Sequence, residues 1–161
     1  MQPRLNDAKA SPEGIQAFLK LGKVVKGSGL ELSLLELVKI RASQINGCAY
    51  CIDLHTKDAQ AAGESEQRIC ALSAWRETPF FTPRERAALA WTEELTKIQQ
   101  SLASDQAYKH ASDQAYEEVR TAFDETDLVK LTLSITSINT WNRLALSFQP
   151  EPGSDQPSAR S

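Results

Sequence analysis

Helix-start and helix-stop signals follow one another along the chain, and no run of four to eight residues alternates cleanly between apolar and polar side chains. Ser11 and Pro12 pair an N-cap residue with proline at the first helical position, and the segment 82–85 repeats that pairing within a capping box. The sequence therefore predicts an all-α fold. With their caps, the expected helices span residues 11–26, 33–46, 48–62, 65–75, 82–100, 112–123 and 124–148.

The last of these helices is apolar on two sides. Its two stripes comprise Leu128, Leu131, Ile135 and Ile138 on one side and Val129, Leu133 and Leu144 on the other. A helix that is apolar nearly all round is expected to be buried, either centrally in its own domain or against another subunit.

Length and charge limit the class of protein. The 161 residues favour one domain, predicted over 1–148, and the proline-rich, polar residues 149–161 have the composition of a disordered tail. A net charge of −3 gives no support to nucleic acid as a partner. No apolar run approaches the roughly 18–20 residues that span a bilayer. The first residues lack a signal-peptide core, and three cysteines are too few for a stapled secreted fold, so we expect a cytoplasmic protein.

One short segment is duplicated. Residues 103–108, Ala-Ser-Asp-Gln-Ala-Tyr, recur at 111–116. A unit of eight residues that is repeated once is not a solenoid period. We interpret it as a local lengthening of the connection before a helix, which weakens any functional claim for His110 inside it.

The segment that carries chemistry is Cys48-Ala49-Tyr50-Cys51, followed by His55. In a helix beginning at Cys48, both thiols and the imidazole share one face across two turns. The helix N-terminus favours a thiolate at Cys48, whereas the i, i+4 spacing places His55 within reach of Cys51 as a proton acceptor. On the residues alone, either cysteine can therefore be the attacking thiol.

Glu36 is the candidate that orients the imidazole. In one continuous helix it would lie about 18 Å from Cys48, because each residue rises about 1.5 Å. A fold-back at Asn46-Gly47 would instead bring it beside His55. The alternative is that Glu36 serves only as the N3 residue of a capping box that begins at Ser33.

Other interpretations of these residues stay open. The two thiols and His55 could bind zinc, with Glu36 or Cys70 as the fourth ligand, although that ligand set lacks a second paired motif. The cysteines could also be inert, and Cys70 is expected to be a buried structural thiol. Tyr50 either packs in a core or interface or lines the thiol pocket. Asn142 falls inside an apolar stripe, so it either makes a structural hydrogen bond or faces the site.

The Glu36, Cys48-x-x-Cys51 and His55 spacing resembles the core motif of the AhpD-like alkylhydroperoxidases of the carboxymuconolactone decarboxylase superfamily. The segments 41–47 and 138–143 are similar to that family as well. The resemblance implies an AhpD-like helical fold, a helix-turn-helix core that carries the Cys-x-x-Cys pair, and a homo-oligomer, either a trimer or a trimer of dimers.

The resemblance also implies an activity, namely reduction of small hydroperoxides through a Cys48/Cys51 dithiol–disulfide cycle, with no metal and no other cofactor. In it Glu36 orients His55, which serves the cysteine pair as base. Cys51 attacks the peroxide and Cys48 resolves the product. A lipoyl-carrying or thioredoxin-like protein is the expected dithiol electron donor.

The sequence leaves two rival functions open. A lactone decarboxylase of the same superfamily has no need of a redox pair, so the two cysteines count against it. A non-enzymatic redox sensor or partner-binding oligomer would use the same disulfide to switch an interface.

Overall fold

The structure is a computed structural model, and it describes residues 3–97 and 111–154. Within these ranges all regular elements are helical, which confirms the predicted fold class. The elements are α1 (Asp7–Ala10), α2 (Pro12–Lys26), α3 (Leu32–Asn46), α4 (Ala49–Ala61), α5 (Glu66–Ala71), the 3₁₀ helix η1 (Leu72–Glu77), α6 (Pro83–Thr96), α7 (Asp113–Arg120) and α8 (Glu125–Phe148).

Most helix starts follow the local sequence. The side chains of Ser65, Thr82, Ser112 and Asp124 each accept a hydrogen bond from a backbone N–H of the following turn, and the predicted capping box at Thr82 is complete. Ser11 precedes α2 without a side-chain cap bond. The sequence did not predict α1, a single turn in which Asn6 accepts from the backbone N–H of the third residue.

The capping box predicted at Ser33 is wrong. Helix α3 begins at Leu32, and Glu31 is its N-cap residue without a side-chain cap bond. Ser33 therefore lies inside the first turn, and Glu36 lies beyond the position from which a side chain reaches back to the N-cap. The carboxylate of Glu36 is free for contacts with another helix.

The bend predicted at Asn46-Gly47 is present and reverses the chain. Gly47 adopts the left-handed conformation with φ 70°. Its N–H donates to the carbonyl of Gln44, and the N–H of Cys48 donates to the carbonyl of Ser43, which together form a Schellman motif. Helix α4 then packs back along α3. The α3–α4 pair is the expected helix-turn-helix core.

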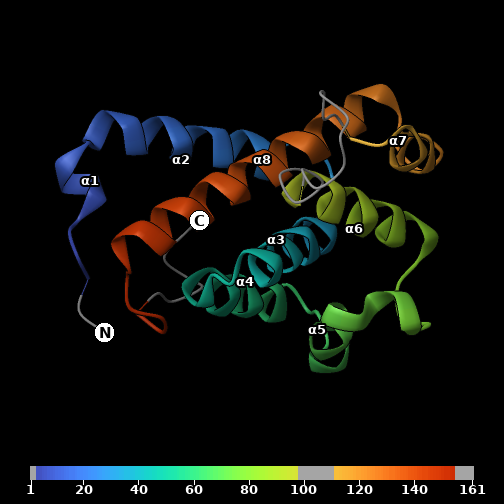
Figure 1. The fold of residues 1–161 in the computed structure, drawn as a ribbon, viewed down its shortest axis with the longest axis horizontal. Helices are drawn as coiled ribbons and strands as arrows, with labels where there is room; N and C mark the ends of the chain where they lie inside the picture. The colour runs from blue at the N-terminus through green and yellow to red at the C-terminus, as the bar shows by residue number, and fades with distance from the viewer. Residues whose placement is uncertain (1–2, 98–110, 155–161) are drawn as a thin grey trace, which may run out of the picture.

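Helix α8 is the long central element, and it contacts α2, α3, α4, α6 and α7 (Figure 1). The first of its two predicted stripes, Leu128, Leu131, Ile135 and Ile138, is buried. The other stripe is exposed at Val129 (59%) and Leu133 (38%), whereas its third residue, Leu144, is half-buried. Among the described residues, no helix is both long and apolar enough to cross a membrane.

The two ends of the described chain lie against the helices. The backbone N–H of Arg4 donates to the carbonyl of Phe148, and the N–H of Gly153 donates to the Asp53 carboxylate on α4. The Gly153 bond thus ties the described part of the predicted tail, 149–154, to α4, whereas residues 155–161 lie outside the described residues. So do residues 103–110 of the duplication, including His110, while the second unit supplies the start of α7.

Candidate active site

The Cys-x-x-Cys pair lies at the start of α4. Cys48 is the N-cap residue, so the helix expected from residue 48 begins at Ala49. The Cys48 and Cys51 sulfurs form a disulfide, with the two Cα atoms 5.4 Å apart. The backbone N–H of Cys51 also donates to the Cys48 sulfur over 3.4 Å. Both side chains are buried, in a cluster with Ala42 and Ile138. The two thiols therefore have the geometry of a redox pair.

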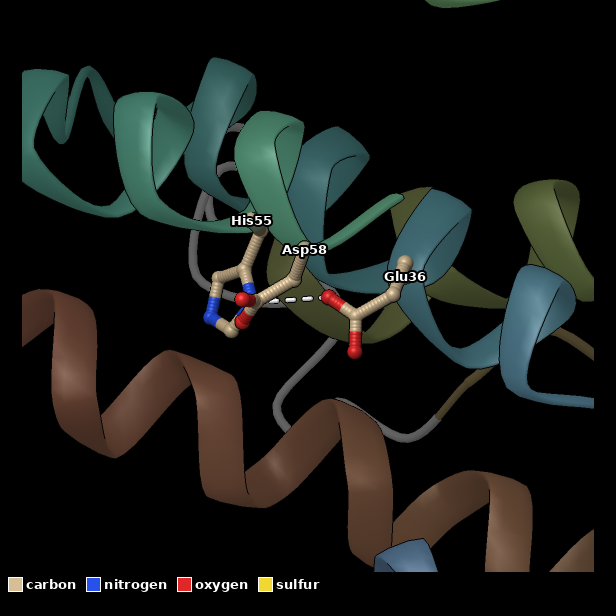
Figure 2. Close-up of side chains that lie close together, drawn as sticks. All are labelled: Glu36, His55 and Asp58. Atoms are coloured by element: carbon tan, nitrogen blue, oxygen red, sulfur yellow. Dashed lines mark hydrogen bonds and ion pairs between the residues drawn. The ribbon is translucent and has the colours of Figure 1, made fainter. Parts of the chain in front are cut away.

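The imidazole of His55 lies one turn further along α4 and meets a carboxylate from α3. Its Nδ1 is 2.8 Å from Oε2 of Glu36 (Figure 2). The second carboxylate oxygen of Glu36, Oε1, accepts a hydrogen bond from Lys39 over 2.6 Å. The fold-back at Gly47 brings these residues together from positions 19 apart in the sequence. The geometry predicted for Glu36 and His55 is present.

The electrostatics fix the direction of this hydrogen bond. Burial by itself would raise the pKa of Glu36, but the hydrogen bond and charge of His55 and those of Lys39 lower it to about 2. Glu36 is then an ionised acceptor at neutral pH, so Nδ1 of His55 must be the donor. That tautomer leaves the lone pair of a neutral imidazole on Nε2, where it can accept a proton.

A second carboxylate, which the sequence analysis did not single out, lies beside the same ring. Asp58 Oδ2 is 3.9 Å from Nδ1 of His55 (Figure 2). Ligand atoms of Glu36, His55 and Asp58 lie within 4.8 Å of one another, an arrangement that could hold a metal ion if Lys39 gave way. The sequence does contain a signal for Asp58, namely its i, i+3 spacing from His55, which places both side chains on one helix face.

These groups open into one cleft of about 1380 Å³ between α2, α4 and α8. Cys51, His55 and Glu36 line it, whereas Cys48 is not among its lining residues in the described part of the chain. Tyr50 lines the cleft and also packs, partly buried, against the cluster that contains both cysteines, so it fits both of its interpretations. Apolar side chains form much of the remaining wall, including Phe18, Leu54, Ile138 and Trp141.

Asn142 and Cys70 lie away from this cleft. Asn142 is completely buried in α8, where its amide donates to the Ser43 hydroxyl and accepts from the Asn46 side chain. It therefore makes the structural hydrogen bonds that were the first of its two interpretations, and it fixes α8 to the end of α3. The prediction of a buried Cys70 is wrong, because this thiol is exposed on the short helix α5.

Comparison with known proteins identifies the family. Residues 12–94 match the model of the carboxymuconolactone decarboxylase family. The chain belongs to this family. The uncharacterized protein YdfG of Bacillus subtilis is 42% identical over 148 residues, which cover 92% of this chain and 95% of YdfG.

Solved structures of similar proteins agree with the fold. A protein of unknown function from Agrobacterium tumefaciens, described as a candidate antioxidant defence protein AhpD, is 43% identical, with a TM-score of 0.86 over 96% of this chain and all of its own. The debrominase Bmp8 is 19% identical, with a TM-score of 0.75 over 94% of this chain and 77% of its own. The expected AhpD-like fold is therefore confirmed, and more than one activity is named for proteins that share it.

Proposed function

We propose that this member of the family is a thiol-dependent peroxidase that reduces small hydroperoxides. One observation carries the proposal, namely a disulfide-forming pair of which one residue, Cys51, lines a cleft that is also lined by His55 and its carboxylate partner Glu36. A lactone decarboxylation would leave the two cysteines without a role.

The proposed cycle begins with both cysteines reduced. Nε2 of His55 accepts the proton of the Cys51 thiol, and the thiolate attacks the outer oxygen of the hydroperoxide. The O–O bond breaks, Cys51 becomes a sulfenic acid, and the alkoxide takes up a proton and leaves as alcohol. Cys48 then attacks the sulfenic sulfur, water leaves, and the disulfide forms. The peroxide has accepted the two electrons that the thiols lost.

Cys51 is the better candidate for the attacking thiol because it borders the cleft, whereas Cys48 sits behind it at the helix end. The position of Cys48 suits the return step. An external dithiol that attacks the Cys51 sulfur expels Cys48 as a thiolate, and the N–H of Cys51 stabilises that anion. The donor implied is a lipoyl-carrying or thioredoxin-like protein. Because the cycle needs a reducing pool, we propose a cytoplasmic location.

The test is peroxide consumption by the purified protein with dithiothreitol or dihydrolipoamide as the reductant. We expect turnover that saturates with an organic hydroperoxide and needs the dithiol. A protein that forms and loses the disulfide reversibly, but consumes peroxide no faster than buffer, would instead be the redox sensor. Metal analysis of the same sample is expected to show no stoichiometric zinc, and zinc at one per chain would contradict the dithiol site.

We further propose that the chain forms a homo-oligomer, a trimer or hexamer, through the exposed stripe of α8. Lysines at Val129 and Leu133 would place two charges in that apolar contact, so we expect the V129K/L133K protein to have a smaller mass by light scattering than the wild type. Lysines at the exposed Gln67 and Ser73 are the matched control and should leave the mass unchanged. A wild-type protein that is monomeric at micromolar concentration would contradict this proposal.

A further inference from the structure

Two carboxylates approach the same nitrogen of His55. Glu36 Oε2 is 2.8 Å from Nδ1 and Asp58 Oδ2 is 3.9 Å from it, on the α3 and α4 sides respectively (Figure 2). The site therefore contains one more negative charge than an orienting hydrogen bond requires. Asp58 belongs to the same helix as His55, so its place beside the ring is set by the i, i+3 spacing and not by the packing of α3.

The charges around the ring determine what Asp58 contributes. The ammonium of Lys39 is 2.6 Å from Glu36, so these two residues form a pair with no net charge. The other charged residues that line the cleft besides Asp58 are Asp7, Lys23, Lys26 and Glu151, and their formal charges also sum to zero. Over all the charged residues that line the cleft, the formal charges therefore sum to one negative charge while the imidazole is neutral, and that is the charge of one carboxylate such as Asp58.

The proposed cycle needs such a charge at one step. When the Cys51 thiol gives its proton to Nε2, the ring becomes an imidazolium beside a thiolate, inside a cleft with apolar walls. A carboxylate within about 4–6 Å favours the charged ring. We propose that Asp58 is a positioning residue that supplies the counter-charge for the His55 imidazolium and thereby promotes proton transfer from Cys51. This inference rests on the proposed thiol chemistry.

The test measures the titration of the His55 imidazole and the reactivity of the Cys51 thiol in separate experiments, neither of which uses peroxide turnover. The midpoint of the His55 titration is followed by NMR in a C48S/C51S background, with an H110Q variant to assign the two histidines. In a C48S/C70S background, where Cys51 is the remaining thiol, the rate of alkylation is followed against pH. Each measurement is made for D58N, for D58E and for D53N, whose parent residue lies on the same helix and binds Lys57 and the Gly153 N–H.

We expect D58N to weaken proton binding by His55 about threefold to tenfold and to slow alkylation near pH 7 by a similar factor. D58E keeps the carboxylate, so it should retain most of the wild-type proton binding by His55 and most of the wild-type alkylation rate. D53N should match the wild type in both measurements. K39M removes the opposing charge, so it should shift the His55 midpoint in the other direction. The K39M shift would show that the His55 midpoint reports charge beside the ring, and a loss in D58N that D58E did not reverse would indicate a structural role for Asp58 and overturn the inference.

Equal titrations for D58N and D53N would overturn the inference while leaving peroxide turnover to be judged by its own assay. If the shifts appear in a protein that consumes no peroxide, the charge coupling stands and the proposed peroxidase function is wrong.

Discussion

Replacing Cys51 with serine is expected to lower peroxide turnover by at least about two orders of magnitude, because the serine hydroxyl is a far weaker nucleophile toward the O–O bond than a thiolate. Cys48→Ser should also stop steady-state turnover, but for another reason. Its Cys51 thiolate can still react once, and the sulfenic acid then has no neighbouring thiol with which to form the disulfide.

The two variants are distinguished by their first turnover. We expect the pre-reduced C48S protein to consume about one peroxide per chain and to become labelled by a sulfenic-acid reagent, whereas C51S should do neither. The matched control is Cys70→Ser, because Cys70 is exposed on α5 and should be dispensable. A single turnover in C51S but not in C48S would reverse the assigned roles, and full activity in both would refute the dithiol mechanism.

The burial of the pair decides how the protein returns to its reduced form. Cys48 is 1% exposed and Cys51 is 3% exposed, so a reductant must reach them through the cleft. Cys51 is the cysteine that lines the cleft, so we expect the reductant to attack its sulfur. The leaving sulfur is then that of Cys48, which accepts a hydrogen bond from a backbone N–H. A reductant with a slender arm suits such access, which is consistent with the dithiol donors that the family resemblance implies.

Local sequence signals were sufficient for most of the fold. The caps at Thr82 and Asp124 and the bend at Gly47 depend on interactions within a few residues, so they can be read without knowledge of packing. The start of α3 could not be predicted in this way. Its N-cap residue Glu31 makes no side-chain cap bond, so no local signal marks this start, and the carboxylate of Glu31 pairs instead with Arg84 on α6.

For the candidate site, the spacing of Glu36, Cys51 and His55 predicted the groups that lie around the cleft, because a two-helix hairpin fixes which residues face each other. The roles of Asp58 and Lys39 depend on charges that come together only once the hairpin has formed. Exposure of Cys70 was also beyond the sequence, since an apolar thiol on a short helix packs or remains exposed according to its neighbours in space.

Glu36→Gln tests whether the Glu36 carboxylate activates the Cys51 thiol through His55. We expect it to have a large effect on both the reactivity of the thiol and the stability of the protein. The glutamine leaves the Lys39 ammonium without its partner close to His55, which disfavours an imidazolium. We therefore expect alkylation of Cys51 near pH 7 to slow by about tenfold or more. Unchanged alkylation would mean that Glu36 has no part in activating the thiol.

The same substitution has a predictable effect on the pH dependence of folding. The pKa of Glu36 is lowered from 4.5 to about 2, and a pKa unit corresponds to about 1.4 kcal/mol, so ionised Glu36 contributes on the order of 3 kcal/mol to the free energy of unfolding. Because the folded-state pKa is the lower one, this contribution is complete above pH 4.5 and is lost as the pH falls toward 2. The difference between wild type and E36Q in urea unfolding should shrink over that interval.

Glu93→Gln is the matched control for this pair of measurements. Burial would raise the pKa of Glu93, but hydrogen bonds from Trp75, Arg41 and Arg76 also lower it to about 2, and it is not among the described residues that line the cleft. Its removal should destabilise the protein above pH 4.5, with the difference from the wild type again shrinking toward pH 2, while leaving alkylation of Cys51 unchanged. If E93Q slowed alkylation as much as E36Q does, the effect of E36Q would reflect general loosening of the fold and not the loss of a carboxylate that orients His55.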